Sequence, residues 1–158
     1  MKKLLFSLLS LLFCVFLFSC GEVVSPYEVA LEFSKTYGRE LTVFSPSISE
    51  GEQGRVDGDF LSSVLGFESD VALDFAVGFS SSLDCHFEFG VVRCKSAYDA
   101  VAMSEQALAR ISFVRSVCSS SGTVMAGEPF VLRYGNTVVY AIVDDEAQAR
   151  RIFDAIFS

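Results

Sequence analysis

One short segment of the sequence holds three side chains that could together bind a metal ion or transfer protons: Asp84, His86 and Glu88. Residues two apart on a β-strand point to the same face and lie about 6.5–7 Å apart, so His86 and one neighbouring carboxylate could share a metal ion. The outer two carboxylates are about 13 Å apart, and a further ligand would have to come from another strand, where Asp74 is a candidate. The same spacing is typical of the solvated face of a half-buried hairpin, and we favour this simpler interpretation.

Cysteines are the other reactive side chains, and three of the five lie after residue 80: Cys85, Cys94 and Cys118. Cys85 and Cys94 are nine residues apart, about 30 Å along one straight strand, which excludes a disulfide between them on that strand. The pairings Cys94–Cys118 and Cys85–Cys118 stay open, and buried free thiols are the expected state. No phosphate-binding glycine loop, Gly-x-Ser-x-Gly turn or Cys-x-x-Cys motif occurs, so the sequence indicates no class of enzyme.

The N-terminal segment has the organisation of a bacterial export signal. Lys2 and Lys3 precede an apolar stretch over residues 4–18. As a helix this stretch would span about 22 Å, less than the ~30 Å hydrocarbon core of a bilayer, so it fits a cleaved signal peptide better than a permanent membrane helix. Its last residues, Leu17-Phe18-Ser19-Cys20, resemble the lipobox of bacterial lipoproteins. The resemblance implies that Cys20 becomes the first residue and carries diacylglycerol.

This interpretation divides the chain into a lipoprotein signal peptide (1–19), a short tether (20–24) and one folded domain (25–158). A competing small-x-small cleavage site, Ser19-Cys20-Gly21, would instead release a protein that begins at Glu22. Two acyl chains suffice for stable anchoring. The lipobox therefore predicts a protein that is held on the extracytoplasmic face of the cell membrane.

Charge narrows the range of partners. The 158 residues carry a formal net charge of −8, and an acidic surface repels phosphate, so nucleic acid is not an expected partner. The acidity also gives no polybasic attraction to anionic lipid, which leaves the lipid anchor as the means of membrane attachment. No motif indicates a cofactor.

The folded part begins with a strong helix start. Ser25-Pro26-Tyr27-Glu28 places Ser at the N-cap, Pro at N1 and Glu at N3 of a capping box, and predicts a helix that ends near Tyr37. The five residues from Cys20 to the cap reach at most ~17 Å, so this helix is expected close to the bilayer. A short strand over 40–44 and a two-turn helix over 59–65 follow.

Two pairs of strands and two further helices complete the pattern. Apolar residues alternate over 71–79 and 83–91, as in two strands joined by a serine turn. A helix over 96–118 comes next, and a hairpin over 130–143 with a tight Gly-Asn turn follows it. The last helix is expected over 144–157.

These elements predict an α+β fold. We expect a two-layer domain in which helices cover one face of an antiparallel sheet of about four strands, in the order ααββαββα. The arginines of the helices are expected on solvated faces; these are Arg110, Arg115, Arg150 and Arg151.

A family resemblance covers the second half of the chain. It is carried by Glu88-Phe89-Gly90-Val91 on a strand, Ala109-Arg110 in a helix, Gly135-Asn136-Thr137-Val138-Val139-Tyr140 and the C-terminal DDEAQARRIFDAIF. With these features residues 70–157 resemble the family called domain of unknown function 4358, whose members are mostly small lipoproteins of clostridial-type bacteria. The resemblance implies a lipoprotein, and it implies no activity and no catalytic residues.

We therefore expect a lipid-anchored, extracytoplasmic module that binds a partner at the cell envelope and is not an enzyme. One alternative is the capture of a small ligand for a transporter, in a pocket between sheet and helices. The other is a metal-binding protein that uses Asp84, His86 and Glu88. An exposed apolar patch would favour protein binding, whereas a deep cleft with converging polar groups would favour a small ligand.

Overall fold

The computed structural model describes residues 24–80 and 84–158, so Cys20 and the leader lie outside the described residues. No helix within these two ranges is both long and apolar enough to cross a bilayer. The elements follow one another as α2 (Pro26–Tyr37), β1 (Thr42–Phe44), η1 (Leu61–Leu65), η2 (Ser69–Val71), β2 (Ala72–Phe79), β3 (Cys85–His86), β4 (Glu88–Cys94), α3 (Ala97–Ser121), β5 (Val124–Met125), β6 (Phe130–Tyr134), β7 (Thr137–Ile142) and α4 (Glu146–Phe157).

Five strands form one antiparallel sheet in the order β1-β2-β4-β7-β6, which confirms the α+β class. The sheet has five strands rather than about four because β1 pairs with the edge of β2, with Val43 opposite Gly78. β2 and β4 are neighbours, as the two alternating segments predict, with Phe75 opposite Val92. The short strands β3 and β5 form a separate parallel pair.

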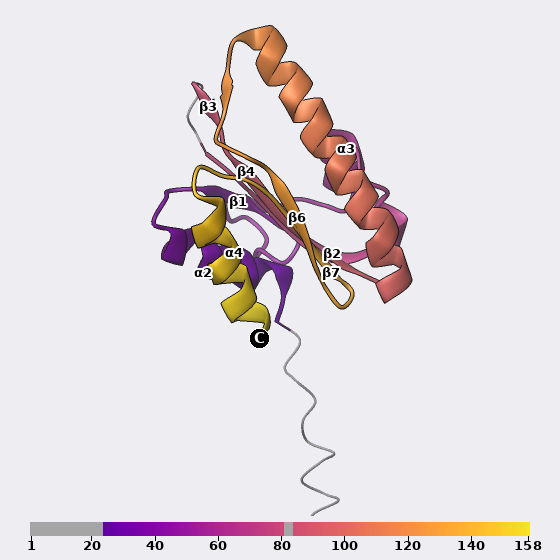
Figure 1. Cartoon of the computed structure of the whole chain (residues 1–158). Coiled ribbons are helices and arrows are strands. Elements are labelled where there is room, and N and C mark those ends of the chain that lie inside the picture. The colour runs from indigo at the N-terminus through magenta and orange to yellow at the C-terminus, as the bar shows by residue number, and fades with distance from the viewer. Residues whose placement is uncertain (1–23, 81–83) are drawn as a thin grey trace, which may run out of the picture.

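Helices cover both faces of the sheet (Figure 1), which corrects the expectation of two layers. The core on one face joins the sheet to α3 and includes Met103 and Tyr140. The core on the other face joins the sheet to α2 and α4, and its Phe33 and Phe153 rings stack 4.4 Å apart. The reason lies in the central strands: nearly all of β4 and all of β7 are buried, and a strand that is buried on both sides needs a layer on each face.

The helix pair α2 and α4 runs antiparallel. Tyr37 at the end of α2 binds the start of α4, where its hydroxyl accepts a hydrogen bond from the Asp145 amide at 2.8 Å. Ser25, which precedes α2, therefore lies at the same end of the molecule as the C-terminus of α4 (Figure 1). In the last turn of α4, Phe157 stacks on Tyr134 with 4.3 Å between ring centroids. This contact places the end of α4 beside the end of β6.

The same end also holds the start of α3. Asn136, in the turn between β6 and β7, donates a side-chain hydrogen bond to the Cys94 carbonyl at 2.8 Å, just before α3 begins. Since β4 runs from Glu88 to Cys94, Glu88 lies toward the opposite end, together with the C-terminal half of α3 (Figure 1). We call the two the Ser25 end and the Glu88 end.

Candidate functional site

Glu88, the first residue of β4, is fully buried under α3. Alternate residues of a strand share a face, and Val92, four residues on, lies in the core under α3. The Glu88 carboxylate accepts hydrogen bonds from Arg110 of α3, Tyr140 of β7 and His86 of β3. A buried charge is tolerated when it is paired and hydrogen-bonded, and this four-residue cluster meets both conditions.

Arg110 contacts both oxygens of the Glu88 carboxylate. Its Nε and Nη2 atoms donate to the two carboxylate oxygens of Glu88, each at 2.9 Å, in the bidentate arrangement that gives charge-assisted bonds their strength. Its Nη1 atom donates to the Val64 carbonyl at 3.2 Å. Only 10% of the side chain is exposed, so the expectation that Arg110 lies on a solvated helix face is wrong. It borders the buried stripe of α3 that includes Ala107 and Ile111, and its long side chain reaches under the helix to β4.

Tyr140 reaches the cluster because Gly90 leaves room for its ring. The two residues are opposite each other in the ladder between β4 and β7, and a Cβ atom on Gly90 would overlap the ring of Tyr140. Phe67 packs edge-on against the same ring, with 5.6 Å between centroids. Held in this way, the Tyr140 hydroxyl donates to Oε1 of Glu88 at 2.7 Å.

Hydrogen bonds keep Glu88 ionised. Burial alone would raise the pKa of Glu88, but the hydrogen bonds from His86 and Arg110, the Arg110 charge and the Tyr140 hydroxyl lower it from 4.5 to about 2. Burial raises the pKa of Tyr140 well above its ordinary value, and the Glu88 charge raises it further. A general acid or base works best with a pKa near the working pH. Glu88 and Arg110 are therefore arranged as a fixed ion pair, and the Glu88 carboxylate is not a group that exchanges protons near neutrality.

The structure brings together two of the three residues that the sequence suggested as a metal site. His86 Nε2 lies 2.9 Å from Oε2 of Glu88, as their shared strand face predicts. Asp84 is exposed and does not join them, and Asp74 instead binds the hydroxyl of a serine in the loop after β1. In the described ranges, no group of three or more His, Cys, Asp and Glu side chains could hold a metal ion. Both carboxylate oxygens of Glu88 already accept hydrogen bonds, from Arg110, His86 and Tyr140.

The interpretation of this segment as a solvated strand face is wrong for Glu88, and the sequence contained a signal against it. In β4 apolar residues occupy odd positions, at Phe89 and Val91, and also even positions, at Val92 and Cys94. This pattern is typical of a strand that is buried on both faces. A glutamate in such a strand needs a buried cation, and a covering helix that contains arginine can supply one.

In the part of the chain that the structure describes, Cys85, Cys94 and Cys118 have free thiols. Cys94 lies next to the start of α3 and Cys118 near its end, so about 30 Å of helix separates them and excludes that disulfide. Burial raises the pKa of Cys94 to about 11 and also raises the pKa of Cys118. Neither of these two buried thiols has the lowered pKa of a reactive cysteine.

Beside the cluster, η1 and α3 border a hollow of about 370 Å³. It is lined by Val64, Gln106, Phe113 and the edge of Arg110. The Phe113 ring lies 5.7 Å from Cζ of Arg110 and yet is 60% exposed, and Val117, one turn later, is also exposed. We call Val64, Phe113 and Val117 the Glu88-end patch. These exposed apolar side chains lie next to Arg110, whose charge is paired with that of Glu88.

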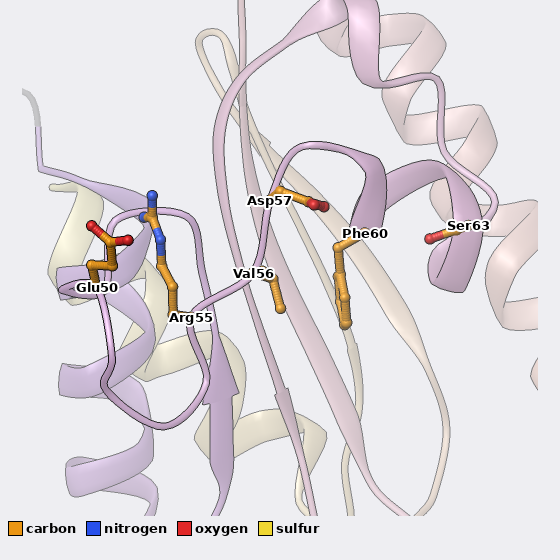
Figure 2. Close-up of a pocket in the computed structure, with 6 residues that line it drawn as sticks. All are labelled: Glu50, Arg55, Val56, Asp57, Phe60 and Ser63. Atoms are coloured by element: carbon orange, nitrogen blue, oxygen red, sulfur yellow. The ribbon is translucent and has the colours of Figure 1, made fainter.

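A second, wider hollow of about 590 Å³ lies over the loop that follows β1. Figure 2 shows Glu50 and Arg55 on this loop, whereas Phe60 lies on the segment that follows and points toward the sheet. Phe60 stacks on Phe44 and Phe75, with centroids 5.5 and 6.2 Å away, so the apolar part of this hollow belongs to the core. The hollow is broad and open, unlike the enclosed cavities that bury most of a small ligand.

Both hollows are open to solvent, and the Glu88-end patch consists of exposed apolar side chains. The resemblance to domain of unknown function 4358 stays a prediction. No protein-family model matches the chain, and no curated protein or solved structure matches it either.

Proposed function

We propose that this protein is a lipid-anchored, extracytoplasmic binding module. In this proposal Cys20 attaches the domain to the membrane, and the Glu88-end patch contacts a protein of the cell envelope. One observation carries it: the patch lies toward the end of the domain opposite Ser25 (Figure 1), and Ser25 follows Cys20 by only five residues. A domain that is anchored at one end presents its other end to partners outside the membrane.

The chemistry of the Glu88-end patch supports a protein partner. Exposed large apolar side chains that gather on one surface mark interaction sites, and aromatic residues with arginine nearby are frequent at the centre of interfaces. Phe113 and Val117 are four residues apart, so they are neighbours on one side of α3. Phe113 is close to Arg110, which binds the Val64 carbonyl.

The surface around the patch is also held in place before any partner arrives. Arg110 ties η1 to α3 through the Val64 carbonyl, and Gln106 of α3 accepts a hydrogen bond from the Glu68 amide at 2.7 Å. A preformed surface loses less conformational entropy on binding than a mobile one. This arrangement suits a module whose task is recognition.

Mass spectrometry of the N-terminal peptide from the membrane fraction tests the anchor. We expect a peptide that begins with diacylglyceryl-modified Cys20. A peptide that begins with unmodified Glu22 would show that the competing peptidase site is used. The anchor, and with it the proposed orientation of the patch, would then be rejected.

Photo-cross-linking in intact cells tests the patch. A photoreactive phenylalanine analogue at position 113 is expected to give an adduct with another envelope protein, and the Val117→Asp substitution should abolish this adduct. Leu108 is the matched control position, because it is 55% exposed on the same helix but lies about 140° around the helix axis from Phe113. Equal labelling from positions 108 and 113, or none from 113, would contradict the assignment of the patch.

A further inference from the structure

The first turn of α2 fixes where the rigid domain begins. The Ser25 hydroxyl accepts a hydrogen bond from the Glu28 amide at 3.2 Å. The Glu28 carboxylate in turn accepts a hydrogen bond from the Ser25 amide at 3.1 Å. This reciprocal capping box ties the chain down at Ser25. The five residues from Cys20 to this point reach at most about 17 Å.

That reach is short compared with the size of the domain. α3 alone has 25 residues, which corresponds to about 37 Å, and it runs from the Ser25 end toward the Glu88 end (Figure 1). The tether is therefore less than half as long as this helix. If Cys20 is in the membrane, the Ser25 end is the part of the domain that the tether holds against the bilayer.

One exposed aromatic residue lies at this end. Tyr98 is 84% exposed and lies in the first turn of α3, which begins shortly after the Cys94 carbonyl that accepts the hydrogen bond from Asn136. Cα–Cβ bonds on a helix tilt toward its N-terminus, and the N-terminus of α3 is at the Ser25 end. Tyrosine is enriched where bilayers meet water, because its ring enters the apolar boundary while its hydroxyl stays hydrated.

We infer that the Ser25 end lies on the bilayer with Tyr98 in the headgroup region, so that the partner surface of the domain faces away from the membrane. This inference rests on the proposed acylation of Cys20 and deepens it by naming the surface that meets lipid. The occupant is a lipid surface rather than a second protein because the short tether brings this end to the membrane. The contact is aromatic rather than electrostatic, since a chain with a net charge of −8 has no general attraction to anionic lipid.

The chain contains no tryptophan, so single-tryptophan variants report depth without background. Acylated protein that carries Tyr98→Trp is reconstituted into phosphatidylcholine vesicles with brominated acyl chains. Acylated Phe113→Trp is the matched control, since Phe113 is another exposed aromatic residue on the same helix but toward the Glu88 end. Tyr98 is almost fully exposed, so its replacement removes little packing.

The expected result is a blue-shifted emission from tryptophan at position 98 and a quenching by bromine severalfold stronger than at position 113. Stronger quenching at 113, or no quenching at either position while the protein floats with the vesicles, overturns the orientation and leaves the anchor standing. A blue shift at position 98 without bromine quenching points to a protein contact and also overturns it. Acylated protein that fails to float with the vesicles overturns the anchor together with the orientation.

Discussion

Replacing Arg110 by methionine is expected to destabilise the fold strongly. The substitution keeps a long apolar side chain but removes the guanidinium that holds both oxygens of Glu88 at 2.9 Å. Because Glu88 is fully buried, its carboxylate would lose the guanidinium that neutralises it, and breaking a buried pair in this way costs about 3–5 kcal/mol. Arg115→Met is the matched control on an exposed position of the same helix, where we expect a change within about 0.5 kcal/mol.

The pH dependence of stability gives an independent estimate of the same interaction. Folding lowers the pKa of Glu88 from 4.5 to about 2, so the ionised carboxylate stabilises the fold above pH 4.5, and this contribution is lost as the pH falls toward 2. Each unit of difference between the pKa in the unfolded chain and the pKa in the folded protein corresponds to about 1.4 kcal/mol of stability. For Glu88 this gives about 3 kcal/mol in total. The Arg110→Met variant should lose part of this acid sensitivity, because, after the hydrogen bond from His86, the hydrogen bonds and the charge of Arg110 are the next causes that lower the pKa of Glu88.

Urea unfolding followed by circular dichroism, repeated between pH 7 and pH 3, measures both effects. A double variant, Glu88→Leu with Arg110→Met, removes the buried charge as well as its partner and should recover most of the lost stability, because replacing both members of a buried pair with apolar residues is often close to neutral. The reasoning would be refuted if Arg110→Met cost less than about 1 kcal/mol, or if the double variant were as unstable as the single one.

Two further substitutions test the positions on which the cluster and the helix start depend. Gly90→Ala should destabilise the fold by about 2–3 kcal/mol, because the new methyl group overlaps the Tyr140 ring. Gly58→Ala is the control, because nothing lies within 4 Å of a Cβ atom at that position. Equal unfolding midpoints for the two variants would contradict this account. Ser25→Ala removes the hydroxyl that caps α2 and should cost about 1 kcal/mol in the same assay, whereas an unchanged midpoint would show that the cap contributes little.

Several parts of the fold could be predicted because short stretches of sequence carry them. The capping box at Ser25 and Glu28 needs only four residues, and the structure confirms it. The tight turn at Gly135-Asn136 and the alternation in β2 are equally local, and both predict the correct antiparallel neighbours. The shared face of His86 and Glu88 also follows from the two-residue period of a strand, and their contact at 2.9 Å agrees with it.

The environment of these residues could not be predicted in the same way. The alternation in the segment with Glu88 was interpreted as one buried and one solvated face, since a strand pattern does not show whether a helix will cover its second side. α3 covers that side and turns a predicted surface glutamate into a buried one. The partners of Glu88 are Arg110, 22 residues away, and Tyr140, 52 residues away, and no local pattern links them.

The sequence by itself therefore determined the start of α2, the turn between β6 and β7 and which side chains share a strand face, because those properties depend on the few residues around each position. It did not show that the predicted strand over 83–91 is divided into β3 and β4, or that β5 follows α3. Only the tertiary structure decided that the sheet has helices on both faces, that Glu88 and Arg110 form a buried ion pair, and that the Glu88-end patch and Ser25 lie at opposite ends. The physical reason is that burial and pairing depend on contacts between distant segments. Those contacts form only when the whole chain has packed.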